Sequence, residues 1–512
     1  MLSRLHTTTA PSVIRSFVLL KPGDRCSALR RSESERILRA MPFIAEASVT
    51  AYADGDAVRI EVLTVDEPSY VADAGLRGGS PFLTRLTLGS GNLRGNAIYT
   101  SLQWRDGGFY RDALALRYSN FQLWGKPYQL HLNAARRELG TDLETEVSSP
   151  FLTDFQRYGW RATGGFSDEF VRFHRGAGVV APALGVQRQF MDAGVLTRIG
   201  PPGFLGLLGA QFSLENTEPD QAPVVITDSG VVNDTTAVLI NRYRAARSVR
   251  LNALLGFRRI RFLRVSGFDA LSAPQDFRTG IQVATTLGTS LGMSSGAAKH
   301  EQYLGTSVYT GAGGLNMFAA VETVVEGRRG EDDEWRDVLS NGRAAWYVKV
   351  HPRHLITADL SWARAHDTRM PVQLALGDRR GGLRGYEGAR IGGGSRVVGR
   401  LEERWRVAAF GGSAGAAISV FTDIGSISAG DVPLGRNSGV RQSVGMALIM
   451  AVPARSQRMW RVDVAMPLQR DKGTGLEVRL SSEDRTRTFW RVPGDIGRAR
   501  ERVLPQSVFR WP

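Results

Sequence analysis

An apolar residue stands at every second position in many segments of the chain after about residue 81. In Val249–Arg258, for example, Leu251 and Phe257 belong to the apolar series, and Arg250 and Asn252 belong to the polar one. Successive side chains of a strand point to opposite faces, so this alternation predicts strands with one apolar and one polar face. The same pattern recurs in four further segments: Tyr128–Ala135, Ile281–Gly288, Arg461–Leu468 and Gly475–Ser481.

The alternation persists for roughly 400 residues without a helical interlude, which exceeds the usual size of one soluble β-sandwich. Short turns alternate with long polar loops, namely Asp220–Asp234, Gly327–Asp337 and Gly377–Ser395. The two longest uncharged stretches, Thr279–Ala298 and Gln302–Val321, are too rich in polar residues for helices in lipid, but they suit tilted strands. The pattern favours a mainly β protein, a transmembrane antiparallel β-barrel of about 16 strands. A soluble all-β array is the alternative.

Residues 13–66 have a different pattern, which predicts a small α/β unit. Val13–Leu20 is expected to form a strand. Ser32 and Glu35 have the spacing of a capping box, so a helix is expected to begin there. Asp54-Gly55 separates two alternating runs and predicts a tight hairpin. Because the unit is small and no convincing export signal precedes it, we expect that the natural start lies further upstream; a cytoplasmic protein without a signal is the alternative.

Composition excludes several classes of function. The 512 residues carry 65 Lys and Arg against 50 Asp and Glu, and 42% are hydrophobic, which is too many for a disordered chain. The single cysteine, Cys26, excludes an internal disulfide and a cysteine-based zinc site, and it is expected to be buried in the small N-terminal unit. With seven histidines and no paired-histidine spacing, neither a metal nor a cofactor is expected.

The basic residues are almost all arginine, 60 against 5 lysines, and they are spread through strands and loops. Because no basic arm or aromatic-interleaved patch is present, nucleic-acid binding is not expected. A compositional bias, lumenal arginines and contacts with lipid phosphates remain open as explanations. Gly411–Gly415 and Gly292–Gly296 fit the pattern GxSxG, but neither precedes a helical pattern, so we expect no esterase and no enzyme.

The stretch Leu376–Gly425 contains the most specific residues of the chain. A glycine-rich loop contains Leu383, Arg384, Gly385 and Tyr386, a strand with Glu402 follows, and the next strand contains Phe421, Asp423 and Gly425. Alternation with the apolar positions predicts that the Asp423 and Glu402 carboxylates point into the barrel, and that Glu403 points to the lipid side near an interface.

An arginine at the tip of this loop can meet those two carboxylates. The planar guanidinium of Arg384 can pair with Asp423 through two hydrogen bonds, and Gly385 allows the tip to turn tightly. Taken alone, an Arg-Gly pair is more often a solvated loop cation.

These motifs resemble the BamA/TamA-type outer-membrane assembly and secretion superfamily, the bacterial surface antigen family of POTRA domains and a transmembrane barrel. Its signature combines a loop tip of the form [VIL]-R-G-[FY], a downstream strand Glu and a strand with F-x-D-x-G. Leu20–Glu67 resembles a POTRA domain, Gly91–Gly95 the approach to the barrel, and Pro150-Phe151 an early-barrel pair. The resemblance implies that the loop packs in the lumen near the meeting point of the first and last strands. We name the eight residues Leu383–Tyr386, Glu402, Phe421, Asp423 and Gly425 the lumenal lock.

The resemblance also implies an organisation of four segments. Residues 1–70 are expected to form a POTRA-like periplasmic domain with a truncated front, 71–88 a linker leading into the barrel, 89–490 the outer-membrane barrel and 491–512 a C-terminal tail. Either Phe489-Trp490 or Phe509-Trp511 can provide the terminal aromatic of the last strand. The seam of the barrel is expected between the strands near Asn96–Trp104 and Leu476–Ser482.

By resemblance, the chain inserts or translocates client polypeptides at the outer membrane, without a catalytic residue. The expected partners are an unfolded or partly folded client and outer-membrane lipids, and the barrel is expected to be monomeric. The POTRA-like domain is expected to capture a client by adding a strand to its sheet edge. Two alternatives are a secretion pore for a partner exoprotein and a lipid-handling or structural barrel on the same scaffold.

Overall fold

The computed structural model describes residues 7–76, 83–107, 110–292, 301–377, 381–410, 412–483, 489 and 492–500. The N-terminal unit contains α1 (Pro11–Ser16), α2 (Ala28–Ala40), β1 (Ile44–Asp54) and β2 (Ala57–Asp66). The next strands are β3 (Tyr70–Leu76), β4 (Leu83–Ser90), β5 (Ile98–Arg105), β6 (Ala113–Leu123), β7 (Tyr128–Arg136), β8 (Thr141–Ser149), β9 (Tyr158–Arg172), β10 (Ala183–Ile199) and β11 (Leu205–Pro219). They are followed by β14 (Ala246–Ser266), β15 (Pro274–Ser290), β16 (Gln302–Gly313), β17 (Met317–Arg329), β18 (Trp335–His351), β19 (His354–His366), β22 (Ser395–Phe410), β23 (Ala414–Ser428), β24 (Arg441–Ala451), β25 (Met459–Pro467) and β26 (Glu477–Glu483). Loops carry the short pairs β12 (Val224–Thr227) with β13 (Gly230–Asn233) and β20 (Leu374–Ala375) with β21 (Gly392–Gly393), and α3 (Gly494–Ala499) follows the last strand.

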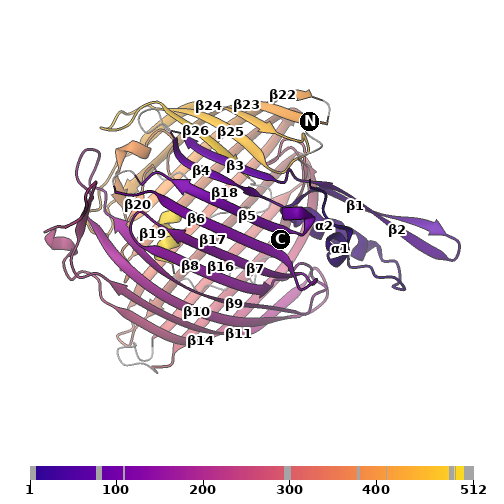
Figure 1. The fold of residues 1–512 in the computed structure, drawn as a ribbon, viewed down its shortest axis with the longest axis horizontal. Helices are drawn as coiled ribbons and strands as arrows, with labels where there is room; N and C mark the ends of the chain where they lie inside the picture. The colour runs from indigo at the N-terminus through magenta and orange to yellow at the C-terminus, as the bar shows by residue number, and fades with distance from the viewer. Residues whose placement is uncertain are drawn as a thin grey trace.

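The described strands form a closed barrel in which neighbours in sequence are neighbours in space (Figure 1). The ring consists of β3–β11, β14–β19 and β22–β26, and β26 lies beside β3. It contains twenty strands, so the predicted barrel is confirmed, whereas the expected number of about 16 is too low. Three of the five alternating segments named above lie wholly in a strand (β7, β14 and β15), and the other two lie mostly in β25 and β26.

The barrel is apolar outside and polar inside. On β14, Leu251 is 51% exposed and Leu255 40%, whereas Arg250 and Asn252 are each only 1% exposed. A soluble protein hides its aliphatic residues and exposes its charged ones, so this distribution is the reverse of the usual one. It is the distribution expected of a barrel surrounded by lipid. None of the helices in the described ranges has the length and apolar character needed to span a membrane.

Two parts of the sequence-based division into segments are wrong. The expected linker at 71–88 instead contains most of β3 and β4, the first two strands of the ring. The seam therefore lies between β3 and β26 and not beside Asn96–Trp104, which lies largely in β5. The strands β3 and β4 are short and rich in alanine or threonine, so their alternation is weak. At the other end, the last described strand is Glu477–Glu483, and of the candidate terminal aromatics only Phe489 lies within the described residues.

The N-terminal unit contains two helices and a hairpin. Val13–Leu20, the expected strand, instead includes most of α1. Pro11 occupies the first helical turn, where its missing N–H costs nothing, and Val13 and Phe17 pack in one core with Leu38 of α2. The hairpin between β1 and β2 is confirmed, and it projects away from the barrel in Figure 1.

The second helix begins earlier than the capping-box spacing predicts. Its N-cap is Ser27, whose side chain accepts a hydrogen bond from the Arg30 amide, so Ser32 lies inside the helix. Glu35 accepts instead from the Val49 amide at 2.8 Å, because β1 packs on this face of α2. Cys26, expected to be buried, is exposed just before the helix.

The N-terminal unit is bonded to one end of the barrel. The Arg39 guanidinium donates two hydrogen bonds to Asp276 at the start of β15, at 2.8 and 2.9 Å. Glu67 accepts from the Gln457 amide at 2.8 Å in the β24–β25 turn. Arg36 donates to the Leu152 carbonyl in the β8–β9 turn. The end that carries the short turns is therefore the end that carries this unit, and the long loops lie at the other end.

The predicted long loops are partly ordered as strands. Asp220–Asp234 contains the β12–β13 hairpin, and Gly327–Asp337 is shortened by the ends of β17 and β18. Gly377–Ser395 remains a loop around β21. Of the two GxSxG patterns, Ser413 lies in the short turn between β22 and β23, and Gly292–Gly296 lies almost entirely outside the described residues.

Candidate functional site

The loop between β19 and β22 folds into the barrel and is held there by its apolar residues. Leu383 and Tyr386 are completely buried, and they belong to one core cluster with Leu374 and Leu376 of the same loop. The Leu383 amide donates to the Leu376 carbonyl at 2.8 Å, which brings the loop tip back toward its own start. Apolar packing and a backbone hydrogen bond therefore help to position the tip, in addition to its charged contacts.

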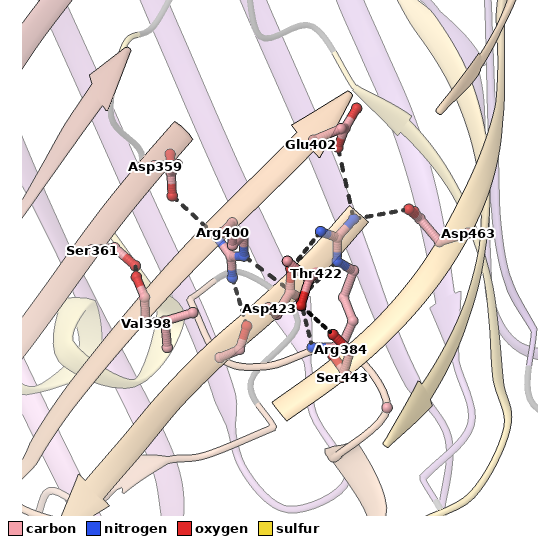
Figure 2. A network of polar contacts seen from close by, with 12 residues as sticks. Asp359, Ser361, Arg384, Val398, Arg400, Glu402, Thr422, Asp423, Ser443 and Asp463 are labelled. Carbon is pink, nitrogen blue, oxygen red and sulfur yellow. Dashed lines mark hydrogen bonds and ion pairs between the residues drawn. The ribbon is translucent and has the colours of Figure 1, made fainter. Parts of the chain in front are cut away.

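Arg384 contacts the carboxylate of Asp423. Its Nε lies 2.8 Å from Asp423 Oδ2 and its Nη2 lies 2.6 Å from Oδ1, which is a two-pronged pair (Figure 2). The Arg384 amide donates to the same carboxylate at 3.3 Å. Asp423 is completely buried on β23, so this carboxylate depends on Arg384 for its charge partner at hydrogen-bond distance.

The remaining arm of Arg384 lies between two more carboxylates. Its Nη1 is 3.2 Å from Asp463 Oδ1 on β25 and 3.9 Å from Glu402 Oε2 on β22 (Figure 2). The guanidinium also lies 3.3 Å from the centre of the Phe421 ring, within the range of a cation–π contact. One loop cation therefore connects three strands of the wall.

Glu402 faces the lumen but is bonded mainly to another arginine. Arg461 Nη1 and Nη2 each lie 2.9 Å from a different Glu402 oxygen, and Arg404 Nη2 lies 3.3 Å away. The contact with Arg384 is longer. Glu402 is therefore held mainly by Arg461 of β25, and its link to the loop is the longer contact with Arg384.

Gly385 and Tyr386 attach the loop to the last strands. The Gly385 amide donates to Glu477 Oε2 on β26 at 2.8 Å, with a φ of +84° that a side chain rarely tolerates. The Tyr386 hydroxyl lies 2.9 and 3.0 Å from the backbone carbonyl oxygens of Gln442 and Gln469, and its single proton can be donated to either. Burial raises the pKa of this phenol, so it remains protonated and able to donate.

Gly425 allows two strands to lie close together. A Cβ atom at this position would lie 2.6 Å from the Val397 carbonyl oxygen of β22, which is closer than real contacts allow. The glycine therefore keeps β23 in register with β22 beside Asp423.

Four residues around the loop tip were not included among the predicted site residues: its partners Asp463, Arg400 and Glu477, and Arg461, which bonds to Glu402 and Asp463. Arg400 donates to the Gly382 carbonyl at 2.6 Å. Its Nε lies 3.9 Å from Asp423 Oδ2 (Figure 2). A signal was present, because Asp463 and Arg461 stand on the polar side of an alternating segment. Alternation gives the face of a strand but not the distance to a loop 79 residues away in sequence.

Glu403 points to the outer side, as expected, and is bonded there. It contacts His354 of β19, whose ring stacks on Trp405 at 5.4 Å between centroids. His354 is the first residue of its strand at the end that carries the short turns. This acid therefore lies near a rim of the barrel and not at its middle.

The chemistry of the cluster is that of attachment. Arginines contact each of the three carboxylates: Arg384 and Arg400 lie within 4 Å of Asp423, and Arg461 pairs with Glu402 and Asp463. Within the described ranges, no group of three or more His, Cys, Asp or Glu side chains is arranged to hold a metal ion. What the arrangement can do is hold a loop across the lumen.

Comparisons with known proteins give matches of structure but not of sequence. No known family model matches the chain, and no curated protein matches its sequence. The chain is similar to BamA from Haemophilus ducreyi lacking POTRA domains 1–3, with 13% identity, a TM-score of 0.42, and coverage of 93% of this chain and 82% of that one. It is similar to CdiB from Escherichia coli, with 10% identity, a TM-score of 0.49, and coverage of 93% and 74%. CdiB from Acinetobacter baumannii matches at 10% identity and a TM-score of 0.41, with coverage of 93% and 72%.

These matches belong to the superfamily that the loop and strand motifs resemble. Since every TM-score is below 0.5, the fold rests on the strand pairing of this chain, and the matches carry no argument about what it does.

Proposed function

We propose that this chain is an outer-membrane β-barrel of the BamA/TamA-type superfamily that inserts or translocates client polypeptides. The single observation that carries the proposal is the bidentate pair between Arg384 and Asp423 inside a closed antiparallel barrel. The sequence motif alone is compatible with a solvated loop. The same motif seated on the lumenal wall is the arrangement that the resemblance implies.

The distribution of side chains supports a position in a membrane. Apolar residues cover the outer face of β23, where Ile418 is 42% exposed, Val420 40% and Ile424 45%. Ser419 and Asp423 of the same strand are completely buried on the lumenal side. Strands that close into a ring satisfy their backbone groups without water, which is required in lipid. An outer membrane is the membrane in which such barrels occur.

The N-terminal unit supports the handling of a polypeptide. Its β1–β2 sheet has two strands among the described residues, and they pair only with each other there. Leu63 and Val65 of β2 are 60% and 45% exposed. An extended client can add a strand to such an edge. The identity of this unit as a POTRA-like domain in the periplasm is part of the proposal.

Reconstitution tests the proposed activity. The purified chain is placed in vesicles of phosphatidylethanolamine and phosphatidylglycerol, and a urea-denatured small outer-membrane barrel is diluted into them. We expect folded client, measured by its faster mobility on an unheated gel, to appear sooner than in empty vesicles. Equal rates would contradict insertion.

The same experiment separates the alternatives. Client that becomes protected from protease inside the vesicles without integrating into the membrane would favour the secretion pore. Transfer of a fluorescent phospholipid without any effect on the client would favour the lipid-handling alternative.

Cys26 tests the orientation, because it is the single cysteine of the chain and is exposed in the N-terminal unit. We expect a membrane-impermeant maleimide to leave it unlabelled on intact cells and to label it after the outer membrane is permeabilised. Protease added to intact cells is expected to cut Asp220–Asp234 and to spare residues 40–67. Labelling of Cys26 on intact cells would show the opposite orientation; a Cys26→Ser variant is the control for background labelling.

A further inference from the structure

The part of the chain that the structure describes after β26 turns back into the barrel. The described residues beyond β26 lie in the lumen, where α3 packs beside β18, β19 and β20 (Figure 1, yellow). Asp495, Ile496 and Ala499 are buried, and Ile496 shares a core cluster with Leu383 and Tyr386 of the lumenal lock. This segment was expected to be a simple tail.

One acidic side chain fixes the segment to the wall. Asp495 Oδ2 lies 2.6 Å from Nη1 of Arg396 on β22, and it accepts from the Ala375 amide at 3.0 Å. Arg396 is only 2% exposed. Removal of the segment would therefore leave a buried guanidinium without this carboxylate.

The other attachments use the backbone of the segment. Arg188 on β10 donates to the carbonyls of Arg498 and Arg500, at 2.7 and 3.0 Å. Arg343 on β18 donates to the Phe489 carbonyl at 2.7 Å. Every polypeptide offers such carbonyls, so these wall arginines contact the segment without reading its side chains.

The attachments reach well-separated parts of the wall, because seven strands of the ring lie between Arg188 on β10 and Arg396 on β22. Between them, Arg500 pairs with Glu326 on β17 at 2.9 Å. At the lock, a Cβ on Gly381 would lie 3.0 Å from Pro493 Cβ, so the segment lies directly against the loop that carries Arg384. It fills space between the lock and the opposite wall.

We infer that Phe489 and residues 492–500 form a displaceable plug, seated in a lumenal path that accepts an extended polypeptide. The plug closes the lumen at rest. After the plug leaves, the wall arginines that bound its backbone carbonyls bind the carbonyls of another chain. The inference that a client displaces the plug rests on the proposed function, whereas the inference that the segment is a plug does not.

Ion conductance across planar lipid bilayers tests the plug without any client. We compare the full chain, a variant that ends at residue 491 and Asp495→Asn, with Asp333→Asn as the matched control because Asp333 is 78% exposed in a surface ion pair. The truncated variant is expected to conduct at least several-fold more than the full chain, Asp495→Asn to open more often, and the control to behave as the full chain. Heat-modified mobility on gels verifies that each barrel has folded.

A synthetic peptide with the sequence of residues 492–512 then tests the path. Added to the truncated variant, it is expected to restore low conductance, and a scrambled peptide of the same composition is expected to block more weakly but measurably. Equal conductance of the truncated and full chains, with the barrel intact, would overturn the plug. If neither peptide lowers the conductance of the truncated variant, the inference of a path that accepts a polypeptide is overturned. A truncated variant that conducts while the full chain inserts no client would leave the plug standing and refute only the proposed function.

Discussion

The variant Arg384→Ala is expected to lose client insertion in vesicles and to be less stable by about 3–5 kcal/mol, the usual cost of removing one partner of a buried ion pair. The change removes both hydrogen bonds to Asp423, whose carboxylate is completely buried, together with the cation over the Phe421 ring. Stability is measured as the urea concentration at which heat-modified mobility is lost. Insertion is measured with the denatured barrel client.

Two further variants show whether the loss is specific. Arg329→Ala removes a cation that is 41% exposed and pairs with an exposed Asp333, so a change of at most about 1 kcal/mol is expected. Arg384→Lys keeps the charge without the planar fork, and an intermediate result is expected. If Arg384→Ala has normal urea resistance and normal insertion, the lumenal lock has no role in this protein.

The variant Glu402→Gln is expected to lower the free energy of unfolding by a similar amount, about 3–5 kcal/mol. Arg461, Arg404 and Arg384 all lie within 4 Å of this carboxylate, and the neutral amide would leave three guanidinium groups facing one another. The urea midpoint of the barrel is the measurement. Because Arg384 keeps its bonds to Asp423, insertion is expected to fall less than in Arg384→Ala.

Glu334→Gln is the matched control for this change. Glu334 is 70% exposed and pairs with Arg336 at the surface, so its replacement is expected to leave the midpoint unchanged. An unchanged midpoint in Glu402→Gln as well would mean that Arg384 and Asp423 hold the loop without the second carboxylate.

Alternation predicted the long strands well because each has one strongly apolar face. It missed the first two strands of the ring for the opposite reason. β3 carries Ala72 and Ala74 between its larger residues, and β4 is eight residues long, so neither gives a clear period. Their place in the ring is set by pairing with neighbours, since β4 lies between β3 and β5.

Local preference also gave the wrong element at the N-terminus. Val13 and Ile14 are β-branched and favour a strand by themselves. In the structure, helical spacing brings Val13 and Phe17 onto one core with Leu38, and this packing outweighs the local preference. Cys26 was predicted to be buried because free cysteines usually are, but it is exposed just before α2.

The lumenal lock was predicted as far as its motif extends. Arg384, Asp423, Phe421 and Glu402 are together, since the motif spans both the loop and two adjacent strands. Asp463, Glu477 and Asp495 could not be paired from the sequence, because closure of the ring and the return of the C-terminal segment bring them near.

The bonds of the loop tip lie on one flank of the junction between β26 and β3. Within the described residues, the side chain of Arg384, the amide of Gly385 and the hydroxyl of Tyr386 bond to β22–β26 and the loop after β25. Sideways parting of β26 from β3 would therefore break none of these bonds. Separation of the two edge strands and release of the loop are independent events, each with its own free energy, and a mutation can alter one while leaving the other as it was.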